Sequence, residues 1–194
     1  MVRRSFVFAL ADKLSVVAMS ILTMAVVSRI LTPAEVGLFL VASTIVILIE
    51  AFRDFGIGTF LIREPDLPPR LVRTAVTIIG CMSLALGGLA VIGAETIARF
   101  YADPHLAGLI RIAAMAFLVA PVSTPLLALL RRDMAFGKVA MISVAAGFVN
   151  ASATIGLALA GFGPFSLAWG SVLAACVTAV GAMICRPQWW IFRP

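Results

Sequence analysis

The longest uncharged stretch of the chain is the feature that most constrains its fold. No residue from 139 to 185 is charged, and most are apolar. The stretch is far longer than the roughly 20 residues with which one α-helix crosses a bilayer. Residues 161–164 (GFGP) form a turn signal in its middle. It therefore predicts two consecutive membrane-spanning helices, over about 139–160 and 165–185.

Four more apolar stretches precede this one and predict helices over about 9–31, 36–52, 74–97 and 112–130. The second is short, so a core or re-entrant segment competes with a full crossing there. Hydrophobic residues make up 62% of the 194 and charged residues only 12%, against about 25% charged in soluble domains. We therefore expect an all-α fold: one transmembrane domain over residues 1–194, a polytopic bundle of about six helices.

The basic residues indicate the orientation of this bundle. The net charge is +6, but the Lys and Arg residues separate apolar runs instead of clustering with aromatic residues, so nucleic acid is not an expected partner. Lys and Arg favour cytoplasmic loops. With six helices and a cytoplasmic N-terminus, twelve of the 15 lie inside and three lie outside, namely Arg29, Arg99 and Arg111. Both termini are therefore expected in the cytoplasm.

The chemistry of an enzyme is missing from the sequence. The single histidine, His105, falls in an expected loop, and Cys81, Cys176 and Cys185 lack the spacing of metal ligands. The tripeptide at 54–56 (DFG) matches a kinase motif, but the other kinase motifs do not accompany it. We expect no enzymatic activity, no catalytic residue, no metal and no cofactor.

Ionisable residues near or inside the spans are the candidates for a binding site, because charge in a membrane is costly and tends to serve function. These candidates are Arg29, Glu50, Arg53 and Asp54. A guanidinium facing a wet cavity can hold a phosphate through two hydrogen bonds. The competing interpretations are that Arg29 extends to the outer headgroups, that Glu50 is an acid at a helix end, and that Arg53 and Asp54 pair at the inner surface.

Asn150 is the fifth candidate, in the helix expected over 139–160. It lies four residues before Thr154, so both side chains share one helix face. Hydrogen bonding to a neighbouring helix is the alternative to a substrate contact.

Several motifs together resemble a known family. They are 28–39 (SRILTPAEVGLF), 54–58 (DFGIG), 61–64 (LIRE), 129–138 (LLRRDMAFGK) and the turn at 161–164. In this respect the chain resembles the polysaccharide biosynthesis proteins, the O-antigen and exopolysaccharide flippases of the multidrug/oligosaccharidyl-lipid/polysaccharide exporter superfamily.

The resemblance implies a function. Such proteins carry an undecaprenyl-diphosphate-linked oligosaccharide across the bacterial inner membrane, through a cavity between two similar halves. The expected partners are this lipid-linked oligosaccharide and membrane lipids. The alternatives are a small-solute or drug exporter of the same superfamily, and a membrane scaffold of a polysaccharide assembly complex that transports nothing.

The length departs from the family pattern. Members usually have about twelve to fourteen helices, so these 194 residues are expected to form the N-terminal half of that fold. The chain would then be a fragment, pair with a second copy, or pair with a separately encoded second half.

Overall fold

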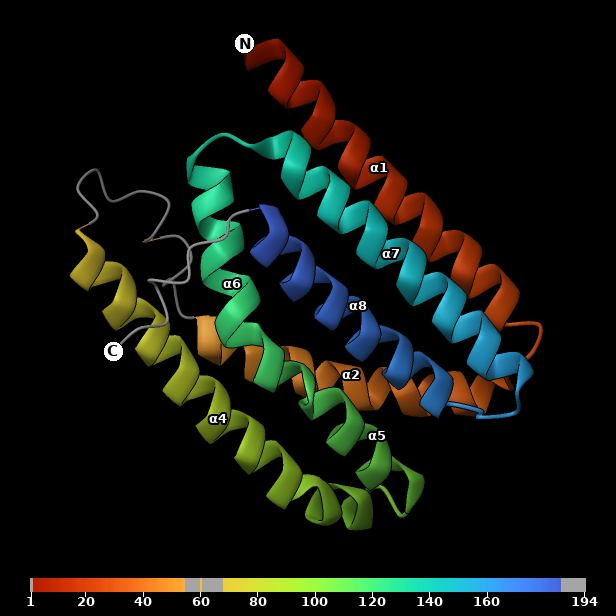
Figure 1. Cartoon of the computed structure of the whole chain (residues 1–194). Coiled ribbons are helices and arrows are strands. Elements are labelled where there is room, and N and C mark those ends of the chain that lie inside the picture. The colour runs from red at the N-terminus through yellow and green to blue at the C-terminus, as the bar shows by residue number, and fades with distance from the viewer. Residues whose placement is uncertain (1, 55–59, 61–67, 186–194) are drawn as a thin grey trace.

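In the computed structural model of the chain, the structure describes residues 2–54, Phe60 and residues 68–185, with only the backbone described for 2–13, Asp54 and Pro69. This part is helical and contains no strand, which confirms the all-α prediction. Its helices, shown in Figure 1, are α1 (Val2–Val27), α2 (Pro33–Asp54), α4 (Pro69–Phe100), α5 (His105–Ala114), α6 (Ala116–Arg132), α7 (Phe136–Leu159) and α8 (Phe165–Cys185).

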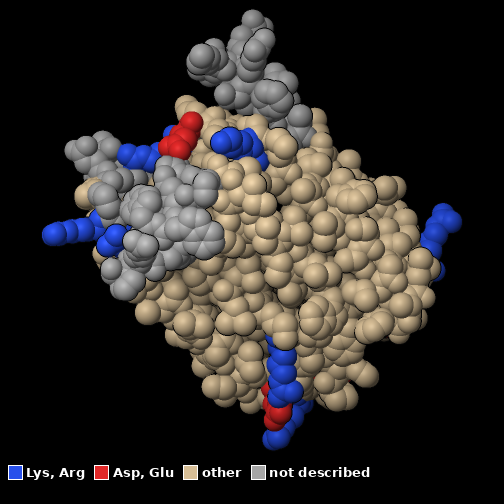
Figure 2. Space-filling model, viewed as in Figure 1, with Lys and Arg blue, Asp and Glu red and all other residues tan. Residues whose placement is uncertain are grey.

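The helices have the length and composition of membrane spans. Within the described residues five helical segments qualify, with α5 and α6 together forming one of them, and the apolar part of α1 adds a shorter sixth, Leu14–Val27. On the face shown in Figure 2, charged side chains lie toward the ends of the helices, and a broad uncharged band separates them. The chain is a multi-pass membrane protein.

The helix ends differ from the sequence-based ranges for local reasons. α1 ends at Val27, short of the expected 31, so Arg29 lies in the turn that follows. α2 begins earlier than expected, at Pro33, because Thr32 and Glu35 form a capping box. The Glu35 carboxylate accepts hydrogen bonds from the Thr32 N–H at 2.7 Å and the Thr32 hydroxyl at 2.8 Å.

The helix expected over 112–130 is two helices. α5 and α6 meet at Met115, and together they run from His105 to Arg132. α6 contains Pro121 and Pro125, and each proline removes a backbone donor from the helix. The bend and the two prolines give this span irregular backbone in its middle.

α8 connects the two sides of the bundle. It packs against α7 on one side and against α5 and α6 on the other. α1 packs along α7 at the edge of the bundle, whereas α4 packs against α5 and α6, and α2 packs against α5 and α4 (Figure 1). A buried cluster centred on α5 includes Ala90, Ala94 and Ala98 of α4. These small residues are four apart on one face, so they let α5 approach closely.

The tightest helix crossing joins α7 and α8. A methyl group at Gly170 of α8 would overlap the Thr154 hydroxyl and lie 2.9 Å from Asn150 Oδ1. Thr154 is 1% exposed, and its hydroxyl donates to Asn150 Oδ1 at 3.5 Å. The two helices can therefore approach this closely only because residue 170 has no side chain.

We predict that Gly170→Ala destabilises the protein by about 1–3 kcal/mol, the usual range for overpacking a tight contact. The matched control is Gly156→Ala on α7, because no atom lies within 4 Å of a methyl group at that position. Thermal unfolding of the purified protein in detergent, followed by circular dichroism, measures both. Equal melting temperatures for the two variants would contradict the described crossing.

Candidate functional site

The last turn of α2 carries an arginine that is buried in the bundle. Arg53 is 5% exposed, and its Nη1 lies 3.8 Å from Oε1 of Glu50, one turn earlier. Its Cζ lies 5.6 Å from the centre of the Phe117 ring on α6. At that distance the guanidinium and the aromatic ring attract each other. The site thus combines a cation, a partly exposed carboxylate and an aromatic ring from two helices.

The guanidinium lies deep in the bundle, as its neighbour Phe117 shows. A methyl group at Gly87 of α4 would lie 3.0 Å from the Phe117 Cβ. At about 1.5 Å per residue, Gly87 is about 27 Å from the first residue of α4 and about 20 Å from the last. On α6, Phe117 is about 22 Å from Arg132 by the same measure. Arg53 therefore contacts the middle of the bundle and not its surface.

The length of α2 explains this depth. α2 has 22 residues and α4 has 32, which corresponds to about 33 Å and about 48 Å of helix. α2 also crosses the neighbouring helices obliquely (Figure 1). It therefore ends before the far end of the bundle, and the side of its last turn that carries Arg53 faces other helices.

The neighbouring part of α4 adds an unusual polar group. Ser83 is fully buried, and its hydroxyl has no hydrogen-bond partner among the residues that the structure describes. It lies on the same face of α4 as Gly80 and Gly87, which approach Pro121 and Phe117. Pro121 has no N–H, so the Phe117 carbonyl lacks its helical donor. Polar groups of α4 and α6 thus lie on the helix faces that meet around Phe117.

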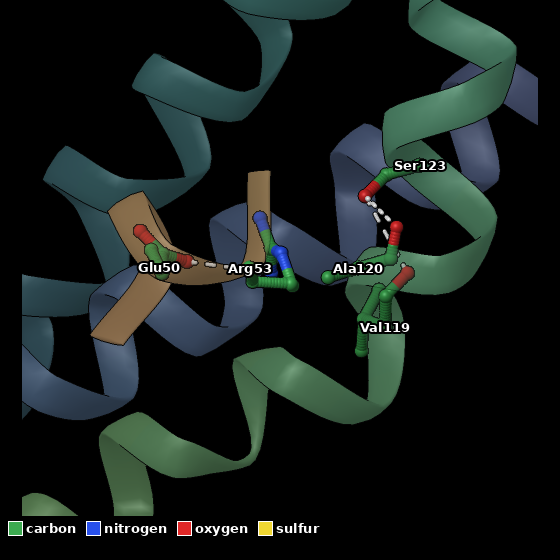
Figure 3. A network of polar contacts seen from close by, with 5 residues as sticks. All are labelled: Glu50, Arg53, Val119, Ala120 and Ser123. Carbon is green, nitrogen blue, oxygen red and sulfur yellow. Dashed lines mark hydrogen bonds and ion pairs between the residues drawn. The ribbon is translucent and has the colours of Figure 1, made fainter. Parts of the chain in front are cut away.

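The prolines leave further backbone polarity beside this site. In Figure 3, Glu50 and Arg53 of α2 lie next to the stretch of α6 that carries Val119, Ala120 and Ser123. The Ser123 hydroxyl donates to the Val119 carbonyl at 3.4 Å and the Ala120 carbonyl at 3.5 Å. These are not the carbonyls that the prolines deprive of donors, so the serine does not repair the gaps.

This arrangement is suited to holding an anion. A buried arginine keeps its charge, because the guanidinium is not deprotonated in proteins. It presents several donors in one plane, which match the oxygens of phosphate. A charge inside a membrane bundle is costly, and such residues mark substrate or ion pathways. The structure thus places Arg53 among other helices, and not at the inner surface where the sequence also allowed it.

The other sequence-predicted site residues lie elsewhere. Arg29 is exposed in the turn between α1 and α2, at the opposite end of α2 from Arg53 and about 30 Å of helix away. The two arginines therefore do not share a site. Asp54 is the last residue of α2, and its side chain lies outside the described residues. Asn150 faces Gly170 in the α7–α8 crossing.

Comparison with known proteins identifies the family. The family described as polysaccharide biosynthesis protein matches residues 26–192. The chain belongs to this family. It is also similar to lipopolysaccharide biosynthesis protein WzxC of Escherichia coli (strain K12), with 26% identity over 144 residues. No solved structure matches the chain significantly.

The match to WzxC covers 72% of this chain but only 28% of WzxC. The chain thus spans less than a third of the relative that it matches. The family assignment confirms the resemblance that motifs such as 28–39 predicted.

Two residues of the site in this polysaccharide biosynthesis protein were not predicted from the sequence. Phe117 and Ser83 are ordinary residues of apolar helices, and nothing local distinguishes them from packing residues. The spacing of Gly80, Ser83 and Gly87, which places all three on one helix face, was a weak signal for a close contact with another helix. The spatial relation of Arg53 to Phe117 depends on tertiary packing alone.

The difference in burial between Arg53 and Arg29 can be measured. In a variant lacking Cys81, Cys176 and Cys185, we predict that a cysteine at position 29 reacts with a membrane-impermeant maleimide at least about tenfold faster than one at position 53. Only the thiolate at the exposed turn meets water freely. Equal labelling rates would contradict the buried position of residue 53.

Proposed function

We propose that this chain takes part in moving an undecaprenyl-diphosphate-linked oligosaccharide across the bacterial inner membrane, for surface polysaccharides such as O-antigen or exopolysaccharide. Membership in the polysaccharide biosynthesis family supports the substrate class. The observation that carries the proposal is the buried Arg53, held by Glu50 and Phe117 in the middle of the bundle. A diphosphate crossing an apolar barrier needs a cation at that depth, since an unpaired charge is very costly there.

The distribution of basic residues between the two ends of the bundle supports an orientation in the membrane. The end of the bundle where α6 ends and α7 begins carries Arg131, Arg132 and Lys138. By the positive-inside rule this end faces the cytoplasm, together with both termini. The end with Arg29 and the α7–α8 turn then faces outward. The substrate would enter from the side of Arg131 and meet Arg53 on its way across.

A cavity for a whole glycan requires more helices than the chain contributes. The aligned region covers 28% of WzxC, and the family resemblance implies two halves around one cavity. We therefore propose that the bundle works with a second half, which is a continuation of the same chain, a second copy or another half-transporter.

The test is complementation of a host strain that lacks its own copy of the gene. We predict that Arg53→Gln abolishes surface polysaccharide, because the diphosphate loses its counter-charge. Arg53→Lys should restore only part of it, since an ammonium keeps the charge but lacks the planar donor set. The readout is surface glycan by gel and by antibody staining, at matched protein levels in the membrane.

Arg29→Gln is the matched control, since it removes the same charge from an exposed turn, and we expect surface glycan close to the wild-type level. Normal surface glycan in Arg53→Gln would contradict the diphosphate role. That result, together with loss of glycan when the gene is deleted, would favour the scaffold alternative.

A further inference from the structure

We propose that the chain holds a second site, a pocket that binds neutral sugar residues of the glycan. This pocket lies at the end of the bundle where α2 begins, whereas Arg53 lies at the other end of α2. The inference rests on the proposed function, since it assigns the glycan and the diphosphate of one substrate to different places. The pocket has a volume of about 530 Å³, within the range of small-ligand sites.

Three segments that are far apart in the sequence form the pocket. They are the first turns of α2, the residues around the start of α5, and the turn between α7 and α8. Figure 1 shows the connection before α2 and the α7–α8 turn at the same end of the bundle. The α7–α8 turn depends on Gly161 and Gly163, whose φ angles are +84° and +55°. A methyl group at Gly163 would lie 2.9 Å from Glu35 Oε1, so the turn closes tightly against α2.

The polar groups of the pocket are built into the helix ends and still have capacity to bind. Glu35 Oε2 accepts both hydrogen bonds from Thr32, and Asp103 Oδ1 accepts from the His105 N–H at 2.9 Å. The other carboxylate oxygens, Glu35 Oε1 and Asp103 Oδ2, accept no hydrogen bond from a described residue. They are acceptors for hydroxyl groups of a ligand.

The charge of the pocket favours a neutral ligand. Three helices begin around it, α2, α5 and α8, and each helix N-terminus carries about half a positive charge. The carboxylates of Glu35 and Asp103 offset this positive potential, and each accepts a hydrogen bond from a backbone N–H next to one of these helix starts. A diphosphate would gain little in such a balanced pocket.

Aromatic rings supply the apolar part of a sugar site. Phe162 is 51% exposed, and the Phe165 ring packs edge-on to His105, with 6.2 Å between ring centres. Both phenylalanines line the pocket. The C–H faces of a sugar ring can pack on exposed aromatic rings while its hydroxyls donate to carboxylates. Carboxylate, imidazole and phenyl groups around one cavity thus fit a sugar better than an ion. No three His, Cys, Asp or Glu side chains of the described chain are placed to hold a metal ion.

The experiment measures binding of the free glycan without its lipid. The probe is the oligosaccharide repeat of the host's own surface polysaccharide, released from the diphosphate by mild acid and added to the full purified chain in detergent. Saturation-transfer NMR titrations give the dissociation constants. We expect binding to the wild type, and binding weaker by about 3- to 10-fold in Asp103→Asn and in Phe162→Ala, the loss of about one hydrogen bond or contact.

Two controls separate this site from that of Arg53. Phe148→Ala removes an exposed ring from α7, and Arg53→Gln removes the diphosphate contact. Both should bind the free glycan as the wild type does, and inorganic diphosphate should not displace it. Four results would each overturn the inference. They are no binding by the wild type, binding by the Asp103 and Phe162 variants that equals that of the wild type, loss of binding in Arg53→Gln, and displacement of the glycan by diphosphate. Because the probe carries no phosphate, the pocket can be established even if Arg53 has no role in translocation.

Discussion

The position of one guanidinium depends on where α2 ends. α2 begins at Pro33, where Thr32 and Glu35 cap it, and after 22 residues in all it ends at Asp54, short of the far end of the bundle. The Arg53 side chain in its last turn therefore reaches α6 and contacts Phe117. A more upright α2 would carry the same arginine toward the membrane surface. The capping box at one end of α2 thus helps to set the depth of the charge at the other.

Burial of this charge has a cost that the fold partly offsets. The carboxylate of Glu50 and the ring of Phe117 both attract the guanidinium. A buried ion pair seldom adds net stability, because desolvation cancels most of the attraction. The buried pair of Arg53 and Glu50 is therefore weak evidence for a role in the stability of the bundle. Pro121 acts in the same direction, since it removes the helical donor from the carbonyl of Phe117, the residue whose ring the guanidinium contacts.

Sequence reasoning predicted the helical class, the membrane location and the family, because apolar runs and the motif at 28–39 are local signals. It identified Arg53 as a candidate but did not predict its depth, which depends on the oblique packing of α2. It grouped Arg29 with Arg53, although a helix length of about 30 Å separates them. The capping box explains one missed boundary, since Thr32 and Glu35 already showed that a helix begins at Pro33. The contact of Asn150 with Gly170 could not be predicted, because only the structure pairs those positions.

The central claim is that Arg53 holds the diphosphate of a polyprenyl carrier. Native mass spectrometry of the purified chain, incubated with undecaprenyl diphosphate or with undecaprenol, tests it most directly. The account predicts that the wild type retains the diphosphate lipid, that Arg53→Gln loses most of it, and that both retain undecaprenol equally, because undecaprenol carries no phosphate. Equal retention of undecaprenyl diphosphate by the wild type and by Arg53→Gln would contradict the claim.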